Sequence, residues 1–179
     1  SSDLKPTEQP TERKEDMNYF LVRQAQNGNL DAFVQLMEQS KQSLYKVAKS
    51  YLKREEDVAD AMQETVLSAY ENLPNLREAS YFKTWLTRIL INRCKDILRQ
   101  NQRVLPMEEI DSGTCPSPEQ DRGFYELLES LPEDYRTLFL LYYGEGFNTR
   151  EIAELLDMNE NTVKSRLQRG RTKLKEALC

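Results

Sequence analysis

Histidine is absent from this sequence of 179 residues, and cysteine occurs only at Cys94, Cys115 and Cys179. With no histidine and so few thiols, a zinc site of ordinary ligand spacing is excluded. The lack of histidine also disfavours most acid–base and nucleophilic catalysis, although Asp and Glu chemistry stays open. An odd number of widely spaced cysteines predicts a reduced, cytosolic protein rather than a disulfide-linked one.

Long apolar runs are missing as well. No stretch approaches the roughly 18 apolar residues of a membrane span, and no signal peptide opens the chain, so we expect no direct membrane insertion. Glycine occurs six times, and no alternating β-branched pattern is visible. Helix formers dominate, which predicts an all-α fold with helices near residues 17–27, 30–53, 56–73, 80–101, 121–129, 133–144, 149–156 and 160–177.

Residues 102–120 divide this helical pattern into two small domains. The segment holds three prolines, one glycine and four acidic residues, which cannot bury enough apolar surface to fold alone, so it is predicted to be a linker. It separates an N-terminal domain (17–101) from a C-terminal domain (121–179). Residues 1–16 are polar and are expected to be a disordered leader. The flexible linker is expected to leave the two domains without a fixed relative position.

Charge is distributed in blocks along the chain. The net charge of the whole chain is −5, yet two segments are basic. Residues 160–179 contain six basic and two acidic residues, and residues 77–105 contain seven basic and two acidic residues. Residues 106–134 hold nine acids against one Arg, and residues 55–76 hold six acids and no base. Two basic patches separated by acidic ones predict several partners of different charge, nucleic acid among them.

The clearest motif lies at residues 148–177. Asn148 or Thr149 can cap a short helix, the sequence Asp157-Met158-Asn159 makes a tight turn, and Asn159 can cap a second helix. This is the layout of a helix-turn-helix that reads the DNA major groove. The first helix has an apolar stripe of Ile152, Ala153, Leu155 and Leu156.

The second helix of this motif separates an apolar face from a polar one. At about 100° per residue, one face collects Val163, Leu167, Gly170, Leu174 and Leu178. The opposite face collects side chains able to reach bases and phosphates: Lys164, Ser165, Gln168, Arg169 and Thr172. The alternative is a solvated basic helix that closes an ordinary bundle.

The helix at 80–101 has a second basic stripe. Its expected core side is Phe82, Leu86, Ile89, Leu90 and Ile97, with Trp85 at the border. The opposite side collects Thr84, Arg88, Ile91, Asn92, Lys95 and Arg99. A polar and aromatic loop, 76–82, precedes it. Cations together with aromatic rings are what a binder of single-stranded nucleic acid needs. The alternative is a surface helix with Trp85 in the core.

The helix at 56–73 is acidic instead. Its expected inward side is Val58, Met62, Thr65, Val66, Ala69 and Leu73, and its outer side is Asp57, Asp60, Glu64 and Glu71. Leu67 lies exposed among these acids, with Gln63 beside it. An apolar residue ringed by carboxylates fits a docking surface for a basic protein, although it can also be an ordinary surface feature.

Five motifs in register resemble bacterial sigma-70-family factors of the extracytoplasmic-function (ECF) group. The resemblance covers about residues 17–178. The motifs are Asp57-x-x-Asp60-x-x-Gln63-Glu64, then Phe82-x-x-Trp85-Leu86-x-x-Ile89-x-x-Asn92-x-x-x-Asp96, then Leu131-Pro132-x-x-x-Arg136, then Glu151-Ile152-Ala153, and finally Thr162-Val163-Lys164-Ser165-Arg166-Leu167-x-Arg169-Gly170-Arg171. Each motif alone is weak, but their order is specific. The resemblance implies sigma domains 2 and 4 and a factor that directs promoter-specific initiation by RNA polymerase.

The resemblance also implies three sets of site residues. A core-binding set would dock on the clamp helices of the polymerase β′ subunit: Asp57, Asp60, Gln63, Glu64 and Leu67. A −10 set would recognise and melt the −10 element: Arg77, Ser80, Tyr81, Trp85, Arg88, Asn92, Lys95 and Arg99. A −35 set would read the −35 element: Arg150, Thr162, Lys164, Ser165, Gln168, Arg169 and Arg171.

Further partners follow from the same resemblance. The C-terminal domain would also grip the β-flap tip, the linker would thread toward the RNA exit path, and an anti-sigma protein would hold the factor in a stress or envelope response. No catalytic residue, metal or other cofactor is implied. The loop at 75–81 is compact where the family's is often longer and rich in Gly and Asp, so the captured base is left open.

Two other classes of protein remain as alternatives. One is an ordinary helix-turn-helix regulator that binds duplex operators without polymerase. The other is an all-α enzyme that uses Asp57, Asp60 and Glu64, spaced i, i+3 and i+7, to hold a divalent metal.

Overall fold

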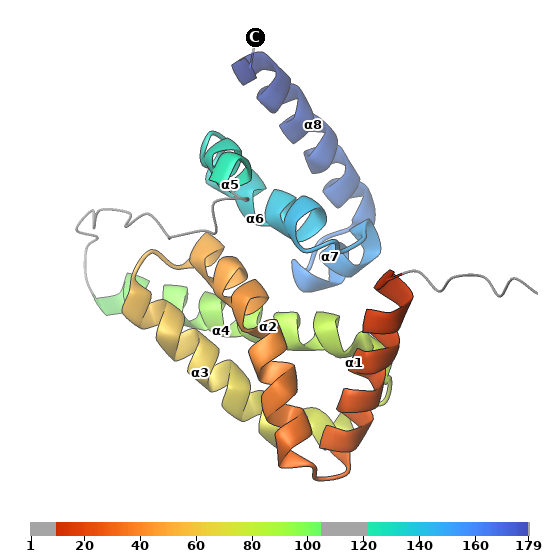
Figure 1. Ribbon diagram of the computed structural model, residues 1–179. Helices are drawn as coiled ribbons and strands as arrows, with labels where there is room; N and C mark the ends of the chain where they lie inside the picture. The colour runs from red at the N-terminus through yellow and green to blue at the C-terminus, as the bar shows by residue number, and fades with distance from the viewer. Residues whose placement is uncertain (1–9, 105–121, 179) are drawn as a thin grey trace, which may run out of the picture.

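The computed structural model describes residues 10–104 and 122–178 of the chain. Every regular element within these residues is helical, which confirms the all-α prediction. Figure 1 shows the helices in two groups, one N-terminal and one C-terminal in sequence. Residues 1–9, 105–121 and 179 lie outside the described residues, and they include most of the predicted leader and linker.

The N-terminal group consists of four long helices and two short 3-10 turns. Their bounds are α1 Pro10–Gln26, α2 Leu30–Tyr51, α3 Glu55–Asn72, η1 Leu73–Asn75, η2 Ala79–Tyr81 and α4 Phe82–Val104. The Asn29 side chain caps α2 by accepting a hydrogen bond from Ala32 N–H at 3.1 Å. Apolar side chains at helical spacing close the core between them, among them Val22, Leu36, Val47, Val58, Leu73, Leu86 and Leu90.

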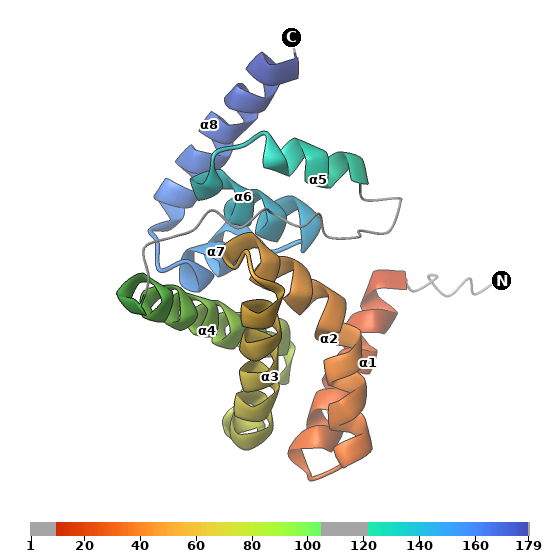
Figure 2. The ribbon, with the colours of Figure 1, turned by 90° about the vertical axis from the view of Figure 1, so that its left-hand side faces the viewer.

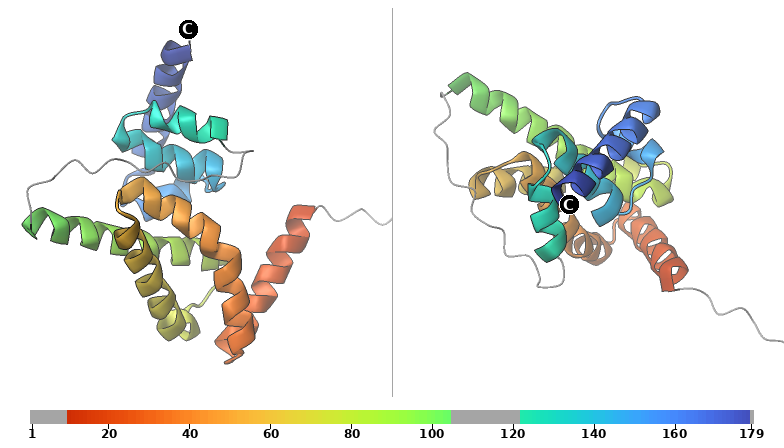
Figure 3. Two further views of the ribbon diagram at one scale, coloured as in Figure 1. Left: turned by 60° about the vertical axis from the view of Figure 1, so that its left-hand side comes forward. Right: turned by 90° about the horizontal axis from the view of Figure 1, so that it is seen from above.

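The C-terminal group is smaller and is built on the helix-turn-helix. Its elements are α5 Arg122–Glu129, α6 Glu133–Phe139, the π-helical turn η4 Leu140–Gly144, α7 Thr149–Leu155 and α8 Glu160–Leu178. Figure 3 shows α8 projecting past the other helices, with its C-terminal end far from the N-terminal group. The sequence predicts a single helix at 133–144. In the structure this segment is an α-helix that widens into a π turn, where Glu145 N–H donates to Leu140 O at 2.9 Å.

The helix-turn-helix has the caps that the sequence predicts. Asn148 and Glu151 form a reciprocal capping box with hydrogen bonds of 2.9 and 2.8 Å. α7 ends where Met158 N–H donates to Ala153 O at 2.9 Å, and Asp157 takes the left-handed conformation (φ 50°) that such a helix end requires. Asn159 then caps α8 by accepting from Asn161 N–H at 2.8 Å.

Several details differ from the expectations. α1 begins at Pro10, so the disordered leader predicted for 1–16 is wrong from residue 10 onward, and α4 continues to Val104, past the predicted linker start. Thr84 and Ile91 are buried rather than on the polar side of α4, and Ile89 is only half-buried. Leu178 is 74% exposed, because the last turns of α8 project beyond the helices that cover its apolar face.

The two groups of helices are in direct contact, contrary to the expectation of unregistered domains. α7 lies on α4, and α6 lies on α2 (Figures 1 and 2). Thr137 of α6 donates a hydrogen bond to Ser50 of α2 at 3.0 Å, and Lys53 lies 3.9 Å from Glu133. α4 packs on α2, α3 and α7, so it buries more than one stripe, as its corrected faces show.

Candidate nucleic-acid interface

The polar face of α8 is open to solvent. Val163, Leu167 and Gly170 are buried against the rest of the C-terminal group. The members of the −35 set on the other side are exposed: Lys164, Ser165, Gln168 and Arg169. Thr162 is half-buried, and Arg150 is exposed at the start of α7, next to the N-terminal end of α8. Amide, hydroxyl and cationic donors are thus presented together at the N-terminal half of one helix.

Glu160 holds the beginning of this face in place. Its carboxylate accepts a hydrogen bond from the Thr149 hydroxyl at 2.9 Å and lies 3.5 Å from Lys164 Nζ. The hydrogen bond and then the Lys164 charge lower the pKa of the Glu160 carboxyl below its ordinary value. Thr149 lies on α7 and Glu160 on α8, so this contact ties the two helices of the motif together.

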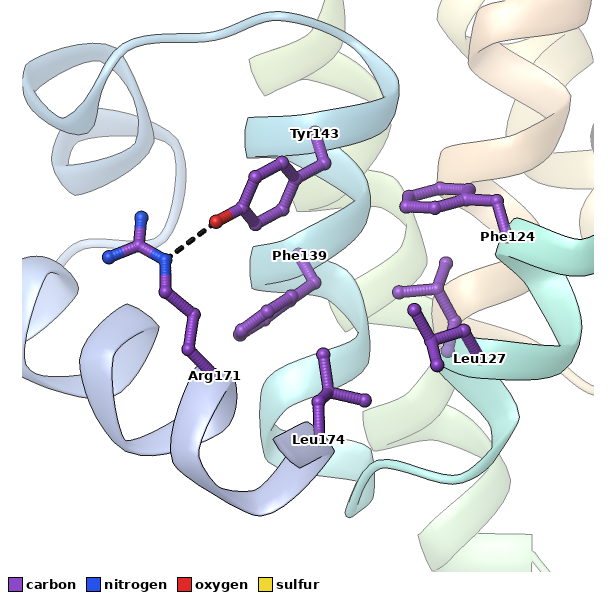
Figure 4. A pocket seen from close by; sticks show the side chains of 7 residues that line it. Phe124, Leu127, Phe139, Tyr143, Arg171 and Leu174 are labelled. Carbon is purple, nitrogen blue, oxygen red and sulfur yellow. Dashed lines mark hydrogen bonds between the residues drawn. The ribbon is translucent and has the colours of Figure 1, made fainter. Parts of the chain in front are cut away.

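Arg171 differs from the other members of the −35 set. Its Nε donates to the Tyr143 hydroxyl at 2.6 Å, and its guanidinium lies 5.8 Å from the ring centroids of both Tyr142 and Tyr143. The hydrogen bond to Tyr143 is the main cause that raises the pKa of Arg171 above its ordinary value. Figure 4 shows the side chain turned toward Tyr143.

Arg171 stands at the rim of an apolar cavity in the C-terminal group. The cavity measures about 280 Å³ and is lined by Phe124, Leu127, Leu128, Phe139, Tyr143, Arg171 and Leu174 (Figure 4). These side chains come from α5, α6, η4 and α8. A half-enclosed apolar hollow with one cation at its edge is suited to an apolar side chain of a partner protein.

The members of the −10 set gather on one side of α4 and on the turns before it. Arg88, Asn92 and Arg99 are exposed, and Trp85 is half-buried with its ring centroid 6.0 Å from that of Phe82. Arg77 and Ser80 are exposed in the turns at 73–81. Arg99 pairs with Asp96 of the same helix. Exposed cations and the half-buried ring of Trp85 therefore lie along one side of α4.

Two members of the −10 set are already engaged by the C-terminal group. The Tyr81 hydroxyl donates to the Glu154 carboxylate of α7. Burial, followed by this hydrogen bond, raises the pKa of Tyr81 above its ordinary value. Lys95 Nζ lies 3.9 Å from Asp157 Oδ2, in the turn of the helix-turn-helix.

Sequence reasoning missed two residues that shape this surface. The Gln26 side chain donates to Leu73 O at 3.0 Å and to Leu76 O at 2.7 Å, and so fixes the loop before α4. Lys83 Nζ donates to Glu145 O and lies 4.7 Å from the Phe147 ring centroid. Both contacts join residues far apart in sequence, so no local pattern signals them.

The core-binding set lies on the outer side of α3. Asp60, Gln63 and Leu67 are exposed, Leu67 to 59%. Asp57 accepts from the Asn101 side chain at 3.0 Å, and Glu64 lies 3.8 Å from Arg93. In residues 10–104 and 122–178 no group of three or more His, Cys, Asp or Glu side chains is arranged to hold a metal ion. Of the three acids in the enzyme alternative, Asp57 and Glu64 thus have separate partners on α4, and Asp60 is exposed.

Comparison with known proteins matches both groups of helices. Residues 36–104 match the family described as Sigma-70 region 2, and residues 122–174 match Sigma-70, region 4. RNA polymerase sigma factor SigV of Bacillus subtilis is 33% identical over 134 residues, covering 73% of this chain and 81% of that protein. The chain belongs to the sigma-70 family.

Other relatives place this sigma factor in the ECF group. The ECF RNA polymerase sigma-E factor of Haemophilus influenzae is 32% identical over 170 residues, covering 84% of this chain and 89% of that protein. Sigma factor RpoE of Bartonella quintana, solved with the anti-sigma factor NepR, has a TM-score of 0.67 and 25% identity, covering 83% of this chain and 98% of that one. CnrH, solved with the cytosolic domain of CnrY, has a TM-score of 0.64 and 27% identity, with coverage of 90% and 96%.

The family establishes what the chain does. As a sigma factor it binds core RNA polymerase and promoter DNA and directs transcription initiation, and it is not an enzyme. The N-terminal group contains the region 2 match and the C-terminal group the region 4 match. None of the helices described here is long and apolar enough to cross a membrane.

Proposed function

We propose that α8 reads the −35 element as duplex DNA. Lys164, Gln168 and Arg169 would contact base edges and phosphates in the major groove, and Ser165, Thr162 and Arg150 would contact the backbone beside them. The observation that carries this proposal is the separation of the faces of α8: its apolar side is buried, whereas these donors are exposed. Arg171 belongs to the proposed set, although its hydrogen bond to Tyr143 must rearrange or be shared.

The −10 element is assigned in this proposal to α4 and the turns before it. Trp85 would stack on an unpaired base, while Arg88, Lys95 and Arg99 would contact phosphates of the displaced strand. Arg77, Ser80, Tyr81 and Asn92 lie at the same surface and would complete the contacts. Support comes from the gathering of these side chains along one side of α4, where Arg88, Asn92 and Arg99 are exposed, and from the fixing of the preceding loop by Gln26.

We propose that core polymerase binds two surfaces of the chain. The core-binding set on α3 would receive the β′ clamp helices, with Leu67 as the apolar anchor and Asp60 and Glu64 as the charged rim. The apolar cavity beside Arg171 would receive the β-flap tip. The acidic linker would run toward the RNA exit path.

Regulation by an anti-sigma protein completes the proposal. One similar structure is sigma factor RpoE in complex with the anti-sigma factor NepR, and another is CnrH in complex with the cytosolic domain of CnrY. An anti-sigma protein would hold this chain in the cytoplasm, in some cases at the membrane, and release it in a stress or envelope response.

Run-off transcription with purified core polymerase tests these assignments. Promoter-dependent transcripts are expected with the wild-type chain and are expected to fall with Asp60→Lys combined with Glu64→Lys, because reversed charges repel a basic partner. A fluorescence titration of core polymerase should show the same loss of affinity. The matched control is Glu71→Lys on the same helix but outside the core-binding set. Unchanged affinity in the double variant would reject this surface.

A further inference from the structure

An acidic side chain lies on the polar, basic face of α8. Glu160 is the first residue of this helix and precedes Lys164 by one helical turn and Gln168 by two, so the three side chains share one side of the helix. The Glu160 side chain is 39% exposed and is therefore accessible from solvent. Residues at the N-terminal end of a recognition helix are the ones that contact base edges. Glu160 thus lies where α8 would meet the DNA.

Contacts with α7 and with Lys164 orient the Glu160 carboxylate. The Thr149 hydroxyl of α7 donates to Oε1 at 2.9 Å, and Lys164 Nζ lies 3.5 Å from the same oxygen. A carboxylate has two oxygens with about four lone-pair sites between them, so Oε2 can accept a hydrogen bond from a further donor. The beginning of α8 therefore presents an acceptor whose position is set by the neighbouring helix.

An acid at this position is unfavourable for DNA binding unless a base donates to it. Its negative charge repels the phosphates that Lys164 and Arg169 are proposed to approach. In the major groove the base donors are the amino groups at N4 of cytosine and N6 of adenine. The usual partner of a Glu side chain is cytosine N4, and the usual partners of Lys are O6 and N7 of guanine. A Glu beside a Lys is therefore complementary to a G·C pair.

We infer that Glu160 and Lys164 together read one G·C pair of the −35 element. Glu160 accepts a hydrogen bond from the cytosine N4 amino group, and Lys164 donates to O6 or N7 of the paired guanine. The spacing of the two side chains fits this pair: cytosine N4 and guanine O6 are joined by a hydrogen bond of about 2.9 Å, and the Glu160 and Lys164 atoms lie 3.5 Å apart. The inference rests on the proposed role of α8 and adds Glu160 to the −35 set.

Two variants test this role of the carboxylate. Glu160→Gln keeps the size of the side chain and an oxygen that accepts from Thr149, but the outer atom becomes an amide nitrogen, which donates and so opposes the cytosine amino group. Thr149→Val keeps the carboxylate but removes the hydroxyl that orients it. The matched control is Glu176→Gln, which removes the same charge from an exposed site in the last turns of α8.

The measurement is the base preference of the holoenzyme at each position of the −35 element. Promoter fragments with a randomised −35 element and a constant −10 element are selected by binding to holoenzyme and sequenced. The wild-type chain should prefer a G·C pair of fixed orientation at one position, and Glu160→Gln should reduce that preference about fivefold to tenfold, as for the loss of one good base contact. Thr149→Val should reduce the preference at the same position by a smaller factor. Because sequences are compared within one protein, a smaller folded fraction leaves the preferences unchanged.

The outcomes separate this inference from the proposed function. Unchanged preference at every position in Glu160→Gln refutes the inference, and so does a gain in affinity that is equal for all sequences, because that gain shows phosphate repulsion alone. A parallel loss of preference at all positions also refutes it, because Glu160 then acts only on the docking of α8. If Gln168→Ala changes a preference and Glu160→Gln changes none, this inference alone fails. If Lys164→Ala, Gln168→Ala and Arg169→Ala all keep the wild-type preferences, the proposed role of α8 fails and the inference fails with it.

Discussion

The helices α4 and α8 are both basic, yet they carry their charge in different surroundings. α8 buries one apolar side, and the donors on its other side are exposed. α4 packs on α2, α3 and α7; Thr84 and Ile91 are buried, and Lys95 faces an acid of the other group. One basic surface is ready for a partner, whereas the other is partly occupied by its own chain. A basic helix is therefore free or blocked according to its neighbours rather than its composition.

The largest effect is expected at the occupied surface. Trp85→Ala should lower promoter opening by the holoenzyme about 10–100-fold, because base stacking on an aromatic ring contributes about 1–3 kcal/mol. Arg88→Ala should act in the same direction through lost phosphate contacts. Permanganate reactivity of unpaired thymines measures the opening. Arg103→Ala, near the exposed end of α4, is the control. Wild-type opening by both variants would remove α4 from the −10 assignment.

A second effect concerns how α8 is supported. A Cβ atom at Gly170 would lie 2.3 Å from Phe139 Cε2, whereas one at Gly123 would meet no atom within 4 Å. Gly170→Ala should therefore destabilise the chain by about 2 kcal/mol through overpacking, measured by chemical denaturation. Gly123→Ala should be neutral or slightly stabilising, since alanine favours a helix. Equal stability of the two variants would show that Phe139 moves aside without cost.

These two helices also show what the sequence can and cannot predict. The helix-turn-helix follows from local signals: Asn148 and Glu151 cap a helix within one turn, and α8 has a single apolar face. The buried faces of α4 do not follow from local signals, because elements distant in sequence pack on this helix. For example, Lys83 of α4 donates a hydrogen bond to Glu145, 62 positions away. The helix that begins at Pro10 does not follow from the sequence, because a polar composition alone does not separate a surface helix from an unstructured segment. The assignment of residues to the three binding sets remains a prediction.

The third effect tests the free surface. Arg169→Ala and Gln168→Ala should each weaken −35 binding by the holoenzyme about tenfold, which is about 1.4 kcal/mol and lies in the lower half of the range of about 1–3 kcal/mol for a bidentate base contact. Neither should unfold the chain, because both residues lie off the buried side of α8. Binding to a set of −35 variants measures the change in preference. Lys175→Ala, in the exposed last turn, should leave both affinity and preference unchanged. If both variants keep wild-type preference, α8 does not read bases through these residues.

The smallest effect shows whether Arg171 contacts the −35 DNA or a protein bound at the apolar cavity. Tyr143→Phe removes the hydroxyl that accepts from Arg171 Nε at 2.6 Å but keeps the ring, 5.5 Å from that of Phe139. The stability loss should be about 1 kcal/mol or less, as for one exposed hydrogen bond. If Arg171 contacts a DNA phosphate, this substitution frees it, so −35 binding should be equal or tighter. Arg171→Ala should then reduce the salt slope of binding by about one. An unchanged slope, together with weaker binding of core polymerase, would instead assign Arg171 to the rim of the apolar cavity.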